Sequence, residues 1–462
     1  MRKIRFFIAL WAGKLLLFVF KRIGRTRDDK PGMASMRLCE DFLAQVAKPE
    51  LTIAVTGTNG KTSISSMVAE MLSKQGLTVS YNDWGANHHA GQARCILDTV
   101  SIFNKPVKDA CVIESDELIS PINIPRIKPN YMIVNNVARD SMLRNANPEY
   151  IAGQLRKACD GSPETVVIIN ADDPLCCFIG EKNRKVYFGA DYLHTNPFEN
   201  IAKDFSVCPV CGASVKYEYR NYRHIGKFIC TDCGVATPAR DFLSKGVSAD
   251  STSISVEEKA GCFDYPLISR GVHNVYNTTA IVALMRDLGN SPEEVAHLLS
   301  VTKLPEFRET RHFVDDVEVI CRVAKGQNAT SVSTVFEHLA KDESKKELII
   351  LLDEIFDNPK KQETVAWIYD TDYEFLNNDN IRKIVIGGPR CKDHYLRLLL
   401  AGLPKEKICC VKDIFETAKL VDHKGVDKIF ILHDVNCVSR GHAVRDAVIE
   451  HIKAKGGKVN AR

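Results

Sequence analysis

The first half of the chain alternates short apolar runs with longer amphipathic segments. Runs of strand length lie at 51–56, 109–113, 131–134 and 165–169. After the first of them, residues 63–75 repeat their apolar positions every three or four residues, which is the spacing of one helix face. Strands that alternate with helices predict a doubly wound, mainly parallel sheet.

The alternation stops between about 196 and 241, where Cys, Tyr, Arg and Gly dominate, so we predict that 196–241 is an insertion in the sheet domain. Helical periodicity returns at 275–288 and at 292–299. The next segment, 303–312, combines proline with charged residues, which is typical of a hinge between domains.

The last third of the chain alternates again. Strand-like runs lie at 347–353, 364–370, 383–388, 407–411 and 428–434, and a helix is expected at 443–453. The sequence therefore predicts an α/β protein in three parts. These are an N-terminal apolar and basic helix over 1–30, a central doubly wound domain over 31–303 with the insertion, and a smaller Rossmann-like α/β domain over 304–462.

The N-terminal segment 6–20 (FFIALWAGKLLLFVF) carries one charge and is flanked by basic residues on both sides. It is shorter than the ~20 apolar residues that a membrane-spanning helix needs. No small-residue cleavage site follows it, as a signal peptide would require. An interfacial helix on a membrane surface and a helix packed on the protein's own body remain open, with a true membrane anchor as a third alternative.

Composition narrows the class of protein. With 462 residues the chain is too long for one core, and 45% hydrophobic with 26% charged residues is typical of globular proteins. A net charge of +4 is too small to predict a nucleic-acid partner. Sixteen cysteines beside a nucleotide loop fit a reducing, cytoplasmic compartment better than a disulfide framework.

The segment 57–62, GTNGKT, stands between a predicted strand and a predicted helix. In that position its glycines allow the backbone amides to surround a phosphate, while Lys61 adds a charge and Thr62 a hydroxyl for Mg²⁺. Val55 occupies the first glycine position of the longer GxxxxGK[ST] loop, so this is a shortened variant. The expected nucleotide-binding residues are Gly57, Thr58, Asn59, Gly60, Lys61 and Thr62.

Two CxxC pairs lie within the insertion. Cys208 and Cys211 precede Cys230 and Cys233 at the spacing of a four-thiolate zinc site, and a glycine follows each pair. Four thiolates fill a tetrahedral coordination sphere and leave no position for water. The expected Zn²⁺ is therefore structural rather than catalytic.

Four segments resemble motifs of the Mur ligases and folylpolyglutamate synthases, in the order expected for their central domain. They are TGTNGKTS at 56–63, IESDE at 113–117, NADDP at 170–174 and GVHNVYN at 271–277. The resemblance implies an ATP-dependent carbon–nitrogen ligase that phosphorylates a carboxylate before it forms an amide bond.

The same resemblance implies roles for individual residues. Glu114 is expected to hold Mg²⁺ between the phosphates of ATP, with Glu117 in support. His273, Asn274 and Asn277 correspond to a nucleotide contact region, although they also suit a helix N-terminus and simple packing. The NADDP turn is expected near the base or ribose, without a catalytic role.

The cysteine insertion and the C-terminal domain resemble one branch of these ligases, the MurT family. Supporting segments are WIYDTDYEF at 367–375, GGPRCKDHYLRLLLAG at 387–402, PGMA at 31–34, DWGAN at 83–87 and VARDSMLR at 137–144. Members of that family are the synthetase subunits that amidate the D-glutamate of lipid II. The resemblance implies ATP-dependent amidation of the α-carboxylate through an acyl phosphate that ammonia attacks, at the cytoplasmic face of the membrane.

Ammonia is expected from a separate subunit, a class I glutamine amidotransferase of the GatD type, because no segment of this chain resembles a glutaminase nucleophile elbow. The resemblance implies that Asp370, or else Asp372, completes the Cys–His pair of that partner. The segment AKGQNATS departs from the family pattern, so Lys325 and Asn328 are shifted candidates for a substrate or phosphate contact. Arg308 is a further candidate for the acyl phosphate.

Two other functions remain to be weighed. One is an amino-acid ligase of the Mur or folylpolyglutamate type that acts alone. The other is a zinc-ribbon binding module with a degenerate nucleotide site, in which the ribbon's basic residues contact nucleic acid or anionic lipid. Those residues are Arg220, Arg223, His224 and Lys227.

Overall fold

The computed structural model describes residues 2–82, 85–140, 147–193, 200–201, 205, 207–302, 309–352 and 365–455. The chain divides into two compact units. The first comprises Met1–Ala138, Asn147–Glu199 and Lys203–Leu304, and the second comprises Arg139–Ala146, Asn200–Ala202 and Pro305–Arg462. The domain boundary predicted at 303–304 lies outside the described residues.

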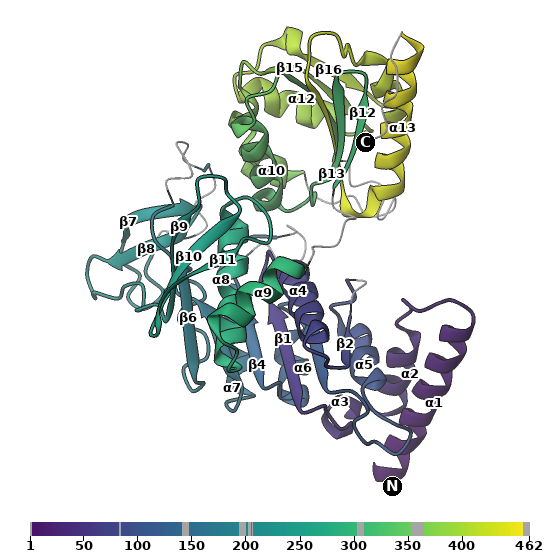
Figure 1. The fold of residues 1–462 in the computed structure, drawn as a ribbon, viewed down its shortest axis with the longest axis vertical. Coiled ribbons are helices and arrows are strands. Elements are labelled where there is room, and N and C mark those ends of the chain that lie inside the picture. Colours follow the sequence, from purple (N-terminus) through teal and green to yellow (C-terminus); the bar gives the residue numbers. More distant parts are fainter. Residues whose placement is uncertain are drawn as a thin grey trace. The chain divides into compact units, whose positions relative to one another are not determined.

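The first unit is built on a nine-stranded sheet with the order β11-β10-β9-β6-β5-β4-β1-β3-β2 (Figure 1). Its strands are β1 (Leu51–Thr56), β2 (Val79–Tyr81), β3 (Ala110–Glu114), β4 (Tyr131–Val134), β5 (Val166–Asn170), β6 (Lys185–Ala190), β9 (Phe242–Val247), β10 (Ser253–Glu258) and β11 (Gly261–Pro266). All neighbours pair in parallel except β9, β10 and β11, which form an antiparallel edge. The strands predicted at 51–56 and 131–134 are confirmed, and those predicted at 109–113 and 165–169 each lie one residue later.

Helices cover both faces of this sheet. They are α1 (Arg2–Arg22), α2 (Lys30–Leu38), α3 (Phe42–Gln45), α4 (Lys61–Lys74), α5 (His89–Asp98), α6 (Ser120–Ile127), α7 (Pro148–Asp160), α8 (Val272–Asp287) and α9 (Pro292–Val301). Because side chains alternate along a strand, Ile53 and Val55 of β1 pack with α4, α8 and α9, whereas Ala54 packs with α6 and α7 on the other face. The helices predicted from 63–75, 275–288 and 292–299 are α4, α8 and α9.

The apolar N-terminal segment is one helix, α1. Its residues Phe6, Leu10 and Leu17 are buried and pack with Phe42 and Leu43 of α3. The helix therefore packs on the protein's own body along one side. Among the described residues, no helix is both long enough and apolar enough to cross a membrane.

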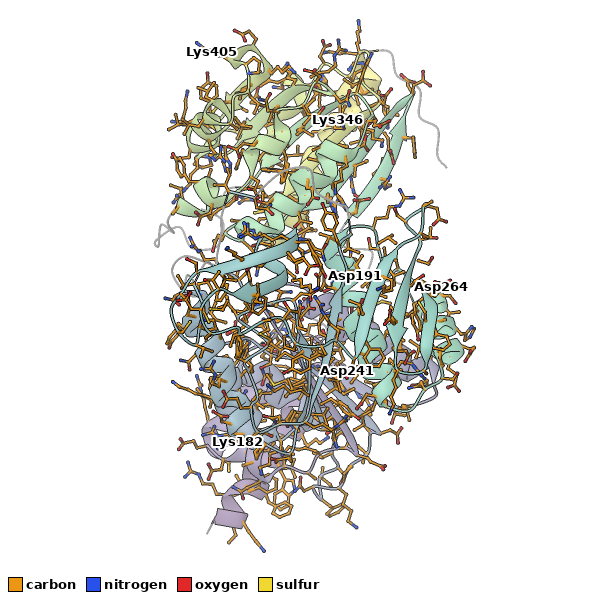
Figure 2. The ribbon with its side chains drawn as sticks, turned by 90° about the vertical axis from the view of Figure 1, so that its left-hand side faces the viewer. Lys182, Asp191, Asp241, Asp264, Lys346 and Lys405 are labelled. Carbon is orange, nitrogen blue, oxygen red and sulfur yellow. The ribbon has the colours of Figure 1, made fainter. Side chains whose placement is uncertain are left out.

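The cysteine segment joins β6 to β9. Its described part contains an antiparallel hairpin, β7 (Val215–Tyr222) and β8 (Ile225–Cys230). Both ends of the segment are fixed to the sheet near Asp191 and Asp241, which Figure 2 labels. The backbone N of Asp191 donates to Ser244 O, and that of Asp241 donates to Tyr187 O, each over 2.8 Å.

The second unit contains a six-stranded sheet with the order β12-β13-β17-β14-β15-β16. Its strands are β12 (Glu309–Val314), β13 (Val317–Val323), β14 (Lys346–Leu351), β15 (Ile381–Gly387), β16 (Ile408–Val411) and β17 (Lys428–His433), and its α-helices are α10 (Ala329–Lys341), α11 (Ala366–Asp370), α12 (Cys391–Leu400) and α13 (Val438–Ala454). Only β12 and β13 pair antiparallel; the other neighbours are parallel. Separate apolar clusters cover the two faces.

Two predictions in this region are wrong. The run 364–370 was expected to be a strand, but Ala366–Asp370 is the short helix α11, which buries the consecutive residues Trp367 and Ile368. Aromatic and β-branched residues favour strands only where a sheet position is open to them, and β15 and β17 already flank β14. The hinge predicted at 303–312 also ends too late, because Glu309–Val314 is the edge strand β12, in which charged residues are usual.

Candidate functional site

The loop between β1 and α4 turns at two glycines. Gly57 and Gly60 have φ angles of 123° and 88°, which residues with a side chain rarely adopt. A Cβ on Gly57 would lie 2.9 Å from Asn136 O, and one on Gly60 would collide with the Asn277 side chain. Both glycines are therefore required by conformation and by space.

The first turn of α4 points its amides toward this loop. Its N-cap is Gly60, so the N-cap position offers no side chain to the free N–H groups. Such a helix start, directly after a parallel strand, favours the binding of an anion. Thr62 lies in the same turn and is partly exposed.

Two asparagines after β4 hold the loop in place. Asn135 Nδ2 donates to Asn59 O over 2.9 Å and to Asn277 Oδ1 over 2.8 Å. Asn136 Oδ1 accepts from Asn59 N over 2.9 Å. The hydroxyl of Thr58 bonds the backbone of Ala138, so Thr58 supports the loop from behind. Asn135 and Asn136 were not predicted from the sequence, because their only signal is their place directly after a buried strand.

Lys61 is held inside the site. Its Nζ lies 2.9 Å from Glu117 Oε1 and donates to Gly57 O over 2.5 Å. The side chains of Lys61 and Glu117 are 9% and 1% exposed, so this ion pair is buried. Because a buried charge without a partner is costly, Glu117 keeps the lysine charged and aimed at the loop.

Glu114 ends β3 beside the loop. The register pairs Val55 of β1 with Glu114, and Asn82 bonds both the N–H and the C=O of Glu114 over 2.8 and 3.0 Å. The carboxylate is 3% exposed, and its Oε1 accepts from Asn87 Nδ2 over 3.4 Å. Its Oε2 has no hydrogen bond to any described residue. A buried carboxylate oxygen without a partner suits a hard cation such as Mg²⁺.

The three residues at the start of α8 separate in the structure. Asn277 is buried and reaches the loop through Asn135. Asn274 accepts from Asn277 over 3.2 Å and donates to Arg270 O, so it stands one step further back. His273 packs on Tyr222, with ring centroids 4.1 Å apart. Asn277 is therefore the best placed of the three for a nucleotide.

The carboxylates of the NADDP turn are structural. Asp172 accepts from Arg240 Nε, Ala190 N and Tyr276 OH, each over 2.8 Å. Burial raises the pKa of Asp172, and Arg240 opposes that shift. This buried pair ties the end of the cysteine segment to the sheet.

The basic residues of the ribbon do not form one exposed face. Arg223 and His224 are 5% and 2% exposed, and His224 Nε2 lies 3.0 Å from Val137 O. A nucleic-acid surface that includes both residues is therefore wrong, because neither side chain reaches solvent.

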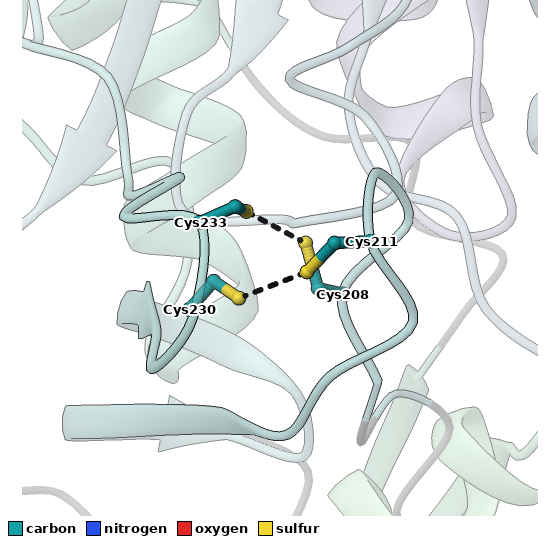
Figure 3. Close-up of side chains that lie close together, drawn as sticks. All are labelled: Cys208, Cys211, Cys230 and Cys233. Atoms are coloured by element: carbon teal, nitrogen blue, oxygen red, sulfur yellow. Dashed lines mark hydrogen bonds between the residues drawn. The ribbon is translucent and has the colours of Figure 1, made fainter.

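The four cysteines of the ribbon converge (Figure 3). Their sulfur atoms all lie within 4.8 Å of one another, with Cys208 and Cys233 3.6 Å apart and Cys211 and Cys230 3.5 Å apart. The arrangement can hold one tetrahedral metal ion.

In the second unit, the two aspartates of the WIYDTDYEF segment differ in availability. Asp372 is 2% exposed and accepts from Ile201 N over 2.6 Å and Asn200 Nδ2 over 3.0 Å. The side chain of Asp370 is 28% exposed and lies 3.1 Å from Arg139 Nη1. Asp370 is the more accessible carboxylate for a partner protein.

Lys325 and Asn328 share one carboxylate of the second unit. Lys325 Nζ lies 2.9 Å from Asp140 Oδ2, and Asn328 Nδ2 donates to Asp140 Oδ1 over 3.0 Å. The two candidates are thus brought together. Arg308, the other candidate near this segment, lies outside the described residues.

Comparisons with known proteins match both parts of the chain. The family model "Mur ligase middle domain" matches residues 55–211, and "MurT ligase C-terminal" matches 326–435. Lipid II isoglutaminyl synthase subunit MurT of Streptococcus pneumoniae is 28% identical over 92% of this chain and 93% of its own length. MurT of Staphylococcus aureus strain COL is 26% identical over 90% of this chain and 93% of its own. Over about 90% of its length, the chain is therefore similar to MurT proteins.

Solved structures show the same fold. The MurT-like chain superposes on a pseudomurein peptide ligase type C from Methanothermus fervidus with a TM-score of 0.67, 18% identity, and 88% and 81% coverage of the two chains. MurF from Thermotoga maritima in complex with ADP gives a TM-score of 0.58, 15% identity, and 93% and 84% coverage. The Mur ligase-type α/β fold with parallel sheets and a C-terminal domain is confirmed.

Proposed function

We propose that the MurT-like chain is the synthetase subunit of an enzyme that amidates the α-carboxylate of D-glutamate in the stem peptide of lipid II. The names of its relatives support the reaction. The observation that carries the proposal is the loop 57–62, a glycine-lined helix start with a buried lysine and a buried glutamate beside it.

ATP is the nucleotide that this loop would hold. The amides of residues 57–62 would surround the β- and γ-phosphates, with Lys61 adding the charge that stabilises the transferring phosphoryl group. Thr62 and Glu114 would hold Mg²⁺, which neutralises phosphate charge when bound. The unpartnered Oε2 of Glu114 fits that role. Asn277 would stand between the loop and the rest of the nucleotide.

The reaction has two balanced steps. A carboxylate oxygen of the substrate attacks the γ-phosphorus of ATP, and ADP leaves. Ammonia then attacks the carbonyl carbon of the acyl phosphate, inorganic phosphate leaves, and ammonia loses a proton as the amide forms. Lys61 contributes to the first step, in which negative charge is redistributed over the phosphoryl oxygens.

Ammonia would come from a glutaminase subunit of the class I type. We propose that Asp370 is lent to its Cys–His pair, where a carboxylate orients the imidazole and stabilises its cation. The exposure of Asp370, compared with the saturated hydrogen bonding of Asp372, supports this choice. Lys325 and Asn328 are proposed to act near the substrate through their shared contact with Asp140.

The four cysteines are proposed to bind one Zn²⁺ with a structural role. The part of the hairpin nearest the cysteine pairs has little core of its own, because residues 215–219 of β7 alternate between half-buried and exposed. A closed four-thiolate site would supply the stability that such a small element lacks.

The test is amidation of lipid II by the purified chain with ammonium or with glutamine, each with and without a GatD-type glutaminase. We expect ammonium to support amidation by the chain alone, and glutamine to support it only with the partner. Lys61→Ala should abolish both. Asp370→Asn should abolish only the glutamine reaction, while Asp379→Asn, an exposed aspartate of the same unit, should behave as wild type.

Ligation of an amino acid without any partner would overturn the proposal in favour of a ligase that acts alone. Loss of the ammonium reaction in Asp370→Asn would contradict the role given to Asp370, because that reaction does not need the glutaminase.

A further inference from the structure

Helix α1 leaves one long side uncovered. Large apolar side chains recur along it every three or four residues, each 40% to 66% exposed: Ile4, Ile8, Trp11, Leu15, Phe18, Val19 and Ile23. This is the spacing of one helix face, so these residues form a single stripe opposite the buried side of α1. Figure 1 shows α1 at the edge of the first unit beside α2.

A neighbouring loop extends the stripe. Trp11 Nε1 donates to Ile102 O over 2.9 Å, which fixes the loop next to the middle of α1. In that loop Ile102, Phe103 and Val107 are 51%, 71% and 56% exposed. We call the stripe and these three residues the α1 surface. An apolar surface of this extent marks an interaction site in a protein that folds in water.

The charges around the α1 surface are mainly basic, and the acidic Asp98 pairs with Lys21 over 2.7 Å. Residues 2–27 contain eight Lys and Arg and no Asp or Glu, and residues 101–108 add Lys105 and Lys108, again without an acidic residue. The guanidinium of Arg22 lies over the ring of Phe18, 5.2 Å from its centroid. An apolar stripe with a tryptophan and basic flanks is the chemistry of a helix in a membrane interface.

We propose that the α1 surface docks on an anionic phospholipid bilayer, with α1 lying in the interfacial plane. A spanning arrangement does not fit, because the other side of α1 is buried in protein. A second copy of the chain is disfavoured, since it would bring two clusters of like charge together. The proposal is independent of the ATP site.

The test is flotation of the full chain with vesicles of phosphatidylcholine, and of phosphatidylcholine with about one third phosphatidylglycerol. We expect at least ~10-fold tighter binding to the anionic vesicles, weakened by salt, and a blue shift of Trp11 fluorescence. Leu15→Glu should weaken binding at least ~10-fold. Leu400→Glu is the matched control, because Leu15 and Leu400 are helical leucines 64% and 65% exposed.

Two results would overturn the proposal: equal binding of Leu15→Glu and wild type, or no binding of wild type to anionic vesicles. Amidation of a detergent-solubilised substrate should be unchanged in Leu15→Glu. That readout reports the folding of the variant and separates failure of this inference from failure of the proposed activity.

A second, independent observation concerns three side chains of the second unit. Cys321 on β13, His433 at the end of β17 and His442 on α13 bring their ligand atoms within 4.8 Å of one another. The parallel register pairs Val323 with His433, so Cys321 and His433 share a sheet face. Gly441 allows α13 to approach, since a Cβ there would collide with the His433 ring.

The donor atoms are ready for a metal ion. His433 Nδ1 lies 2.9 Å from Asp434 O, which can only accept, so the proton is on Nδ1 and Nε2 carries a lone pair. Among the described residues, no hydrogen bond engages that Nε2, either ring nitrogen of His442, or Cys321 Sγ. We infer a site for a Zn²⁺-class cation with one sulfur and two nitrogen ligands and a fourth position open to water.

Metal content and Co²⁺ absorption spectra test this site. We expect about two metal ions per wild-type chain and about one in Cys321→Ser and in His442→Ala, with the four-thiolate spectrum of the ribbon retained. Cys211→Ser should instead lose that spectrum and keep a weaker, single-thiolate band. Cys410→Ser, in the same unit, is the control. An unchanged metal count in His442→Ala would overturn the inference.

Discussion

In each unit, the segment from the end of a strand to the first residue of the helix that follows it contains a lysine, a glycine and an asparagine. The two helices differ in their N-cap residue. In the first unit the N-cap of α4 is Gly60, which has no side chain to offer. In the second unit the N-cap of α10 is Asn328, whose side chain accepts from Ser331 N over 2.8 Å. The first helix start therefore has no side-chain cap on its amides, whereas the second satisfies one of its amides itself.

The lysines of the two loops also differ in burial. Lys61 is buried and aimed inward by Glu117, while Lys325 is 40% exposed on Asp140. One N-cap residue and one partner thus separate the proposed anion site from a capped turn. A lysine and a glycine near the end of a strand do not by themselves predict phosphate binding.

Gly60→Ala gives the strongest test of this difference. A Cβ at this position would collide with the Asn277 side chain, and a φ of 88° is unfavourable for alanine. The loop would therefore have to open. We expect ATP affinity to fall at least ~100-fold, comparable to the loss of a phosphate-site donor. Isothermal titration measures the affinity. Unchanged affinity would mean that the loop does not cradle phosphate.

Asn135→Ala should act on the same loop with a smaller effect. It removes hydrogen bonds to Asn59 and Asn277 but leaves the glycine turns. We expect ATP affinity to fall ~10-fold, from the loss of one or two buried hydrogen bonds. The same titration measures this loss of affinity. Asn130→Ala is unsuitable as a control, because the Asn130 side chain accepts a hydrogen bond from Thr52 of β1. Asn378→Ala in the second unit should leave the affinity unchanged.

Asn328→Ala should affect stability rather than ATP binding. Loss of this cap costs about 1 kcal/mol of unfolding free energy, and the lost contact with Asp140 adds to it. Urea denaturation measures the change. If ATP affinity fell as strongly as in Gly60→Ala, the contrast between the two helix starts would be wrong.

Asp287→Asn should give the smallest effect, and one that depends on pH. The hydrogen bond from Arg184 lowers the pKa of Asp287, so its stabilising contribution is present above the ordinary pKa and is lost as pH falls through the lowered one. We expect wild type to exceed the variant by about 0.5 kcal/mol at pH 7, after solvent screening, and by progressively less in acid as pH falls through the lowered pKa. Denaturation at both pH values measures the difference, and ATP affinity should not change.

Most of the central parallel strands could be predicted because buried strands are apolar, as at 51–56 and 131–134, but β2, β6 and β13 were not predicted. The antiparallel edges, β9 to β11 and β12, were missed because charged and polar residues alternate along them. Helix α11 was missed because whether residues 366–370 form a strand or a helix depends on the neighbouring strands, about which the local pattern carries no information.

The site divides in a similar way. The glycines and Lys61 follow from chemistry at a strand end and Glu114 from the resemblance to the Mur ligases, and the structure places them together. The asparagines that hold them, Asn82, Asn135 and Asn136, could not be found, because amides that bond the backbone have no characteristic spacing. The choice of Asp370 over Asp372 needed exposed fractions and partners, which only the structure supplies.

The cysteine segment joins β6 and β9, and these strands are parallel neighbours. A connection between parallel neighbours must carry the chain back along the full length of the sheet, and helices usually perform that crossover. Here the cysteine segment forms the crossover connection in place of a helix. A shortened chain could therefore not replace it with a tight turn, and any graft would need a dozen or more residues that return to the start of β9.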